Sequence, residues 1–349
     1  MREVRGLAIT PEQAAWAAMH DVEGQMIVPS PLKWPGGKGR PSYVGPLRDA
    51  FNRVGRQRRV VEPFLGGANI ALNLQPERAL LSDSDPHLIS AYEHMLSPEG
   101  ISIDWSQFTD DEGMIEKPTF YDLIRGGLPQ GRIGTWPPRE GSLNHFMQNM
   151  QDLSPEERRR MVQMWLLFQQ AAYQGHTRRR DGLFRIGSGT LGPYSPTWDY
   201  SHYAPLMRGW DLRNMGIADF MDSDLVNPEQ DFLVLDPPYL KQGANYTPDG
   251  FDRLQQPMAE WAGGLAQQGL PIVAFNSQFA RPLYDKERFN TILHSRMDTS
   301  GGRGGQRGVQ PEMIAYANIP DMDWFRNHPS AQFIKSQDAF AIGWSMLSH

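Results

Sequence analysis

The stretch Arg59-Val60-Val61-Glu62-Pro63-Phe64-Leu65-Gly66-Gly67-Ala68 decides the fold of this chain. A short apolar strand enters a glycine turn, and an apolar helical pattern (70–74) and a second apolar run (79–81) follow directly. Strand, turn, helix and strand in this order form a βαβ unit, which implies a parallel sheet with a right-handed crossover. We predict further strands at 214–219, 231–235, 271–275 and 312–317. The sequence therefore predicts an α/β protein with a doubly wound, mostly parallel sheet and helices on both faces.

The glycine turn of that unit is suited to binding a nucleoside cofactor. Gly66 and Gly67 allow the backbone to approach a ligand, and the helix that follows offers N–H groups to a carboxylate. The three-glycine spacing of the dinucleotide fingerprint is absent, which disfavours a dinucleotide-dependent oxidoreductase. Asp83 ends the next strand, where an acid can accept both ribose hydroxyls. An ordinary tight turn and a helix cap are the structural alternatives, although Asp85 fits the cap better. Asp219, at the end of the strand predicted at 214–219, is a candidate contact to the cofactor's adenine.

A second stretch, Phe232-Leu233-Val234-Leu235-Asp236-Pro237-Pro238-Tyr239, carries the chemistry. The amine on an aromatic base is a poor nucleophile because its lone pair is delocalised into the ring. Hydrogen bonds from the amine to Asp236 and to the Pro237 carbonyl would favour a tetrahedral nitrogen, and Tyr239 would stack on the base. The base must leave the duplex to reach these groups. Transfer of a methyl group to this amine depends on the alignment of the reacting atoms, and it needs no covalent intermediate and no metal. The structural alternative is a turn that ends the strand.

The composition narrows the reaction and the setting. The 349 residues include no cysteine, which excludes disulfides, thiolate zinc sites and cysteine nucleophiles. Methylation at carbon 5 of cytosine requires a thiolate and is therefore excluded as well. Apolar residues make up 40% and charged residues 21% of the chain, as in globular proteins. The start of the chain shows no basic-then-apolar leader, and no apolar run approaches the length of a membrane span, so we expect a cytoplasmic protein.

Charge is distributed unevenly along the chain. The net charge of −6 is a mild argument against DNA binding, which usually requires a positive field. Arginines nevertheless cluster at 158–160, at 178–180 with Arg185, and at Arg303 with Arg307. The first cluster follows Ser154-Pro155-Glu156-Glu157, a good helix start, so we expect it on the outer side of a helix around 155–172.

The motifs resemble the Dam-type DNA adenine-N6 methyltransferases of the alpha arrangement, in which the recognition module lies between the cofactor loop and the catalytic tetrapeptide. Lys33-Trp34-Pro35-Gly36-Gly37-Lys38 resembles the family's Lys-Trp-x-Gly-Gly-Lys segment. Residues 64–68 resemble its Phe-x-Gly-x-Gly loop with a shift, and residues 236–239 resemble its tetrapeptide. The resemblance covers about residues 32–317. It implies a Rossmann-like class I methyltransferase sheet, S-adenosyl-L-methionine as the cofactor and DNA as the partner.

The resemblance also assigns residues to the cofactor. It implies that Trp34 and Lys38 line the methionine end and that Phe64 lies beside the adenine, while Lys33 faces DNA. Asn276 stands where the family has an asparagine after its next strand. The expected cofactor contacts are Trp34, Lys38, Phe64, Gly66, Gly67, Asp83, Asp219 and Asp236.

The recognition segment departs from the family pattern. Tyr173-Gln174-Gly175 resembles a Tyr-Asn-Gly hairpin start, and Arg178 falls near a guanine-reading arginine, but His176, Arg179 and Arg180 do not match. Clustered arginines bind phosphates as readily as guanine edges, and Tyr173 fits a packed aromatic as well as a wedge in the base stack. We expect relaxed or non-GATC specificity. The expected DNA contacts are Lys33, Tyr173, Gln174, His176, Arg178, Arg179, Arg180 and Arg185.

The predicted organisation has three parts. Residues 1–27 form a helical extension, 28–100 and 211–349 form the catalytic domain, and 101–210 form the inserted target-recognition domain, while 300–308 is expected to be a mobile loop.

Cytosine-N4 methylation of DNA and adenine methylation of RNA are alternatives with the same chemistry. A catalytically silent nucleic-acid-binding homologue is the alternative from another class. A cognate restriction enzyme would be a separate chain.

Overall fold

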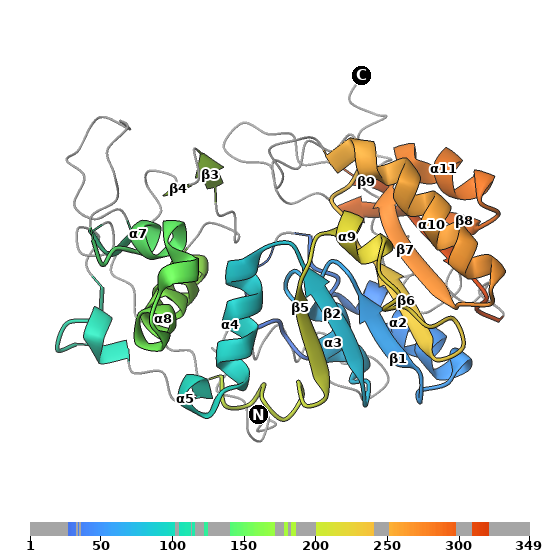
Figure 1. Cartoon of the computed structure of the whole chain (residues 1–349). Coiled ribbons are helices and arrows are strands. Elements are labelled where there is room, and N and C mark those ends of the chain that lie inside the picture. The colour runs from blue at the N-terminus through green and yellow to red at the C-terminus, as the bar shows by residue number, and fades with distance from the viewer. Residues whose placement is uncertain are drawn as a thin grey trace, which may run out of the picture. The chain divides into compact units, whose positions relative to one another are not determined.

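The computed structural model describes residues 27–32, 34, 36–101, 105–112, 114–115, 122–124, 140–171, 178–180, 183–185, 200–240, 251–297 and 309–320. These residues fall into two compact units. Figure 1 shows the chain coloured by residue number. The described parts of one unit lie within 30–37 and 85–207, and those of the other lie within 27–29, 38–84 and 208–320. The predicted domain limits stay a prediction. The predicted extension at 1–27, apart from Ile27, and the predicted loop at 300–308 lie outside the described residues.

In the described part of the chain, seven strands form the sheet of the second unit in the order β5-β2-β1-β6-β7-β9-β8. The five strands from β5 to β7 are parallel, and β9 is antiparallel to both β7 and β8. The strand order reverses between β1 and β6, which is a topological switch point. The predicted fold class, an α/β protein with a Rossmann-like, mostly parallel sheet, is confirmed. The bounds are β1 Arg59–Glu62, β2 Ala79–Asp83, β5 Trp210–Asn214, β6 Asp231–Leu235, β7 Ile272–Ser277, β8 Asn290–Met297 and β9 Val309–Ala317.

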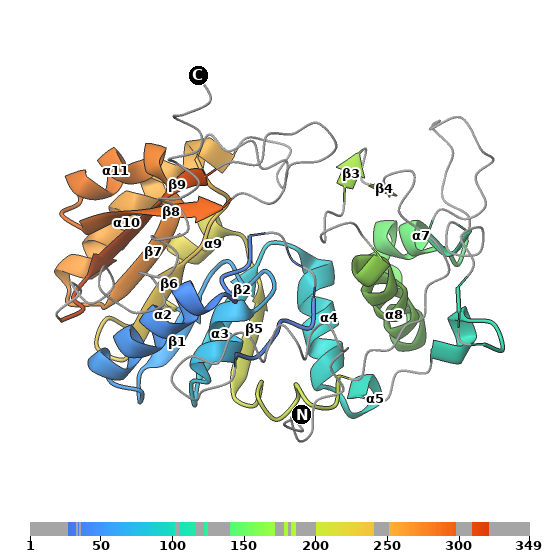
Figure 2. The ribbon, with the colours of Figure 1, turned by 180° about the vertical axis from the view of Figure 1, so that it is seen from behind.

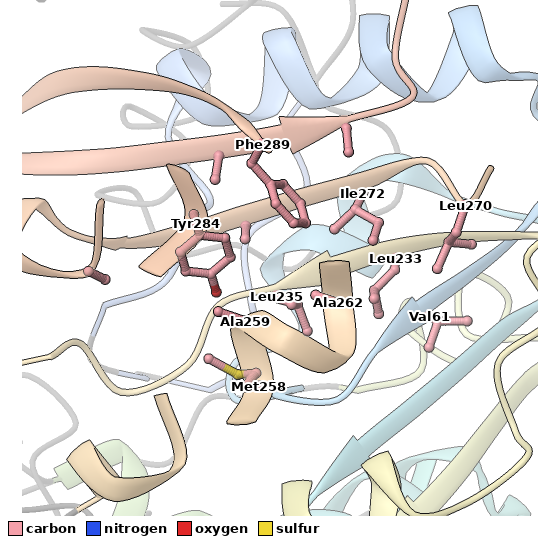
Figure 3. Packing of buried hydrophobic residues seen from close by; sticks show 14 of the residues in the cluster. Val61, Leu233, Leu235, Met258, Ala259, Ala262, Leu270, Ile272, Tyr284 and Phe289 are labelled. Carbon is pink, nitrogen blue, oxygen red and sulfur yellow. The ribbon is translucent and has the colours of Figure 1, made fainter. Parts of the chain in front are cut away.

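Helices cover both faces of this sheet. Strand β6 is buried along its whole length, and its side chains alternate between the faces. On one face Phe51 of α2 (Pro41–Val54) stacks on Phe232 with ring centroids 5.7 Å apart. On the other face α10 (Gln255–Gln267) packs on Leu233 and Leu235 (Figure 3). Each such buried side chain contributes roughly 1.5–3 kcal/mol. The remaining helices here are α3 Asn69–Leu74, α9 Ile217–Met221, η4 Phe251–Leu254, η5 Gln278–Ala280 and α11 Arg281–Lys286.

One predicted strand was wrong. The third strand of the large sheet in chain order is β5, at Trp210–Asn214, and the second half of the region predicted as strand 214–219 lies in the short helix α9. Strand β5 lies at the sheet edge and is only partly buried, so it lacks the continuous apolar run of an inner strand. Phe220 is fully buried and packs edge-on against Trp261. Asp219 is therefore an exposed residue in the first turn of α9 and does not end a strand.

The first unit is mainly helical in its described parts. Helix α8 (Pro155–Ala171) confirms the helix predicted around 155–172. It begins with a capping box, in which Glu157 N–H donates to Ser154 Oγ at 3.3 Å and the Glu157 carboxylate accepts from Ser154 N–H at 2.9 Å. Residues 158–160 are exposed, as predicted. The other elements are α4 Pro86–Leu96, α5 Pro98–Ile101, η1 Trp105–Phe108, α7 Leu143–Gln148, η2 Met150–Asp152 and the antiparallel pair β3 Arg178–Arg180 and β4 Leu183–Arg185.

Figure 2 shows the ribbon from behind, with α2 and α3 on the near side of the sheet. None of the helices in the described residues has the length and apolar character needed to cross a membrane. The sheet edge where β1, β2, β6 and β7 end is the part of the fold that concerns function.

Candidate active site

Strand direction gathers polar side chains at one edge of the sheet. Strands β1 and β2 end at Glu62 and Asp83, and Asp236 follows the last residue of β6. Parallel strands share one carboxyl edge, and ligands bind there in open α/β sheets. Because β9 runs antiparallel to β7, it begins where β7 ends, and Glu312 pairs in register with Ser277. Four carboxylates from four strands therefore belong to the same edge.

A buried lysine binds the first residue of the tetrapeptide. Lys38 Nζ lies 2.6 Å from Oδ1 of Asp236 and 3.7 Å from Oε1 of Glu312. The lysine side chain is 2% exposed and the Asp236 side chain 17%. The rings of Tyr43, Tyr239 and Phe275 surround the ammonium group, with centroids 5.6, 5.0 and 5.1 Å away. Aromatic faces and carboxylates together stabilise a cation that has lost its water.

Tyr239 is fixed through its hydroxyl group. That hydroxyl donates to Oε1 of Glu312, and the hydroxyl of Tyr43 donates to Oε2 of the same carboxylate. Burial raises the pKa of the Tyr239 hydroxyl well above its usual value, and the negative charges of Glu312 and Asp236 raise it further. The hydroxyl therefore remains a protonated donor. Glu312 is almost fully buried whereas Tyr239 as a residue is only partly so, which is compatible with a ring that stacks on a base.

A hydrogen-bond relay holds the tetrapeptide corner from behind. Gln255 Nε2 donates to the Pro238 carbonyl at 2.7 Å, and Asn276 Nδ2 donates to Gln255 Oε1 at 2.8 Å. Leu240 N–H donates to Asn276 Oδ1 at 3.0 Å, and Ser277 Oγ donates to the Leu240 carbonyl at 2.6 Å. Prolines have no N–H group, so the carbonyls and the following residue are the points by which the corner is held. The relay gives Asn276 a structural role at this corner.

The glycine turn is tied to the end of the next strand. Gly66 has φ +45°, and its N–H donates to Oδ2 of Asp83 at 3.0 Å. Ala68 precedes α3 with φ +54°, a conformation that costs a non-glycine residue about 1–2 kcal/mol. Ala68 stands where the family's loop has its second glycine, so the departure from the family pattern keeps the turn at the cost of local strain. Gly67 is buried within the same turn.

Asp83 is not a helix cap. The cap of α4 is Asp85, whose Oδ1 accepts from His87 N–H at 3.0 Å, as predicted. The Asp83 carbonyl accepts from Met215 N–H at 3.1 Å and from Asn214 Nδ2 at 3.0 Å. The backbone of Asp83 thus joins β2 to the end of β5, and its carboxylate joins β2 to the glycine turn.

Glu62 is a buried acid at the end of β1. Burial raises its pKa well above the ordinary value of 4.5, and the neighbouring charge of Asp236 raises it further. A hydrogen bond from the Ala71 backbone and the charge of Lys38 act in the opposite direction. Oε2 of Glu62 is buried and has no hydrogen-bond partner among the described residues. An edge with an excess of carboxylates and one orphaned acceptor fits a cationic ligand such as S-adenosyl-L-methionine.

The remaining predicted residues are placed as follows. Phe64 is partly buried, and its ring contacts Phe251 edge-on at 5.7 Å. Trp34 is partly buried and belongs to the other unit. Lys33, Tyr173, Gln174 and His176 lie outside the described residues. The backbone of residues 178–180 forms β3 and Arg185 ends β4. Among the described residues, no group of three metal-ligating side chains has a geometry that could hold a metal ion.

Three residues of this site were missed from the sequence. Glu312 had a visible signal, because an acid at the head of the apolar run Met313-Ile314-Ala315 needs a reason to be buried. Tyr43 and Gln255 had none, because each follows no motif and reaches the site from a helix.

Known proteins of similar sequence are DNA adenine methyltransferases. The family model of the D12 class N6 adenine-specific DNA methyltransferases matches residues 34–180. The chain is 26% identical over 297 residues to the DNA adenine methylase of Escherichia coli strain K12, which covers 81% of this chain and 93% of that protein. The DNA adenine methylase of Escherichia coli O157:H7 matches equally well. The chain is similar to the Dam-like adenine methyltransferases. The predicted resemblance is confirmed. The residues matched by the family model include Lys38 and the glycine turn, whereas Asp236 lies beyond them.

Proposed function

We propose that this Dam-like methyltransferase transfers a methyl group from S-adenosyl-L-methionine to the N6 amine of adenine in DNA, after the base has left the duplex. The observation that carries the proposal is the carboxylate of Asp236, held by buried Lys38 beside the ring of Tyr239. A carboxylate, a proline carbonyl and an aromatic face at one strand end match the donors and the face of a flipped adenine.

The tetrapeptide residues act mainly by alignment. Asp236 and the Pro237 carbonyl accept hydrogen bonds from the amine, and Tyr239 stacks on the base, so the nitrogen lone pair points toward the methyl group. When bound, the cofactor would supply an electrophilic methyl group on a sulfonium. The adenine nitrogen would gain the methyl group and release one proton to solvent, while the sulfur would keep the electron pair of the C–S bond. Asp236 stabilises the positive charge that develops on the nitrogen during this step.

The cofactor is proposed to bind across the glycine turn. Asp83 would accept the ribose hydroxyls while it holds Gly66 N–H, because a carboxylate offers about four acceptor positions. Phe64 would contact the adenine, and Trp34 and Lys38 the methionine end. The exposed position of Asp219 in α9 gives no support to a contact with the adenine.

DNA contacts are proposed for the hairpin β3–β4. Arginines 178–180 and 185 form most of its two strands, a density of positive charge that suits phosphates of any sequence. Lys33, Tyr173, Gln174 and His176 remain proposed contacts. Because few of the residues with which the family recognises the bases of its target are retained, we infer relaxed or non-GATC specificity.

The test is analysis by mass spectrometry of nucleosides from unmethylated DNA and RNA incubated with the enzyme and S-adenosyl-L-methionine. We expect N6-methyldeoxyadenosine from DNA. N4-methyldeoxycytidine, or methyladenosine from RNA alone, would contradict the proposal and favour the corresponding alternative. Transfer to none of these substrates would favour a nucleic-acid-binding homologue without turnover.

A further inference from the structure

Glu312 is the least expected charged residue at the active-site edge. It lies on β9, is 1% exposed, and is reached by three groups from three parts of the fold. The hydroxyls of Tyr43 and Tyr239 donate to its two oxygens, and Lys38 Nζ lies 3.7 Å from Oε1. A buried acid is costly unless it is paired. Of these three groups, Tyr239 belongs to the tetrapeptide, Lys38 binds Asp236, and Tyr43 contacts Lys38.

The charge of Glu312 affects how strongly Asp236 can accept a hydrogen bond from the amine. Lys38 and Asp236 alone would form a neutral pair, in which the ammonium group weakens the carboxylate as an acceptor for an amine. Glu312 shares the same ammonium group, so the three side chains together carry one net negative charge. In a site of low dielectric constant that charge favours the cationic nitrogen of the transition state.

The geometry of Glu312 also concerns the stacking ring. A tyrosine ring that must lie against a base gains from a fixed hydroxyl, because each ordered rotamer saves entropy at the moment of binding. Oε1 of Glu312 anchors Tyr239, while Tyr43 fixes Oε2 from α2. The carboxylate of Glu312 therefore orients the ring of Tyr239 and also offsets the positive charge of Lys38.

We propose that Glu312 is a positioning residue for methyl transfer, which shares Lys38 with Asp236 and anchors the ring of Tyr239. The inference rests on the proposed transfer to adenine. It assigns Glu312 no contact with the substrate or the cofactor, so its loss should lower turnover much more than cofactor affinity.

The test compares Glu312→Gln with Asp231→Asn. The glutamine keeps the shape and an acceptor oxygen but removes the charge. Asp231 is an equally buried carboxylate, paired with Arg59 at 2.7 Å at the opposite end of β6, so its variant controls for general loss of stability. We expect kcat to fall about 10- to 100-fold in Glu312→Gln, with S-adenosylhomocysteine affinity by calorimetry within about threefold of wild type. Asp231→Asn should melt at a lower temperature and keep kcat within about twofold at a temperature where it is folded.

A wild-type kcat in Glu312→Gln, or equal losses of kcat in both variants, would overturn the inference. If Glu312→Gln shows no cooperative unfolding, Tyr43→Phe decides instead, because it removes only one donor to the carboxylate. We then expect a severalfold loss of kcat with affinity preserved, and an unchanged kcat would overturn the inference. Failure of the wild-type enzyme to methylate adenine would instead refute the proposed function.

Discussion

The Nζ atom of Lys38 lies 2.6 Å from Oδ1 of Asp236, although the two residues are 198 positions apart in the chain. The pair joins the segment before α2 to the end of β6, so two motifs that are distant in sequence meet in one buried contact. Removing one partner of such a pair leaves an uncompensated buried charge, which is strongly destabilising. The lysine motif and the tetrapeptide therefore act as one unit in this fold.

Replacement of Asp83 by Ala should weaken cofactor binding. The change removes the proposed ribose acceptor and the bond to Gly66 N–H, while saturated turnover should change comparatively little because ribose contacts alter little along the reaction. Calorimetry with S-adenosylhomocysteine measures the affinity. Asp85→Ala is the matched control, since this cap of α4 should contribute about 1 kcal/mol of stability without affecting affinity. An Asp83→Ala variant that binds like wild type would leave Asp83 with only a structural role.

Replacement of Glu62 by Gln should make stability less dependent on pH. Burial raises the pKa of Glu62 above 4.5 in the folded state, so the folded protein binds a proton more tightly than the unfolded chain does. The stabilisation is fully present below the unfolded pKa and is lost as pH rises through the folded pKa. The melting temperature of Glu62→Gln relative to wild type should therefore increase from about pH 5 to pH 8. For the exposed control Glu77→Gln, the melting temperature should follow that of wild type at every pH. The same behaviour in Glu62→Gln would show that Glu62 does not have a raised pKa in the folded state.

Replacement of Gln255 by Ala should loosen the tetrapeptide corner. The change removes Gln255 as the hydrogen-bond partner of the Pro238 carbonyl and of the Asn276 amide, which costs about 1–3 kcal/mol of stability. We expect kcat to fall at saturating cofactor and DNA. The neighbouring residue Gln256 is exposed and bonds only toward Glu260 among its described contacts, so Gln256→Ala should behave like wild type. Equal kcat values for the two variants would show that the relay does not matter for turnover.

The sheet was largely predictable because its inner strands are apolar runs next to turn residues. Residues 231–235 and 271–275 show this pattern, and the structure has β6 and β7 there. The prediction misplaces the edge strand β5 because this strand carries the partly buried Asp211 and the exposed Arg213, which break the apolar pattern. Helix α9 was read as a strand because Ile217 and Phe220 point into the core at helical spacing within only five residues.

Site residues that directly follow an apolar strand could be predicted from the sequence. A residue that reaches the site only through the register of a strand pair could not. Asp83 and Asp236 follow apolar strands, so their common edge could be inferred. Glu312 reaches that edge only because β9 runs antiparallel and pairs Glu312 with Ser277. Strand direction and register are tertiary properties, and a single sequence does not specify them at a late strand.

Replacement of Arg179 or Arg180 by Ala should lower activity about equally on all DNA sequences. A side chain that holds phosphates contributes no base readout, and its loss should also reduce the salt dependence of binding. Methylome sequencing of DNA from cells that express each variant measures the sequence context. Arg159→Ala, on the exposed side of α8, is the matched control. If wild-type methylation falls almost wholly within one motif of four to six bases, the inference of relaxed specificity is wrong, while the proposed transfer would stand.

The most direct test of the central claim is the pre-steady-state rate of methyl transfer by Asp236→Asn, measured alongside its affinity for S-adenosylhomocysteine. The carboxylate is proposed to act on the amine in the transition state, so the asparagine variant should lose about 10²–10³-fold or more in rate and much less in affinity. A rate within a few-fold of wild type would contradict the assignment of Asp236 as the acceptor for the adenine amine.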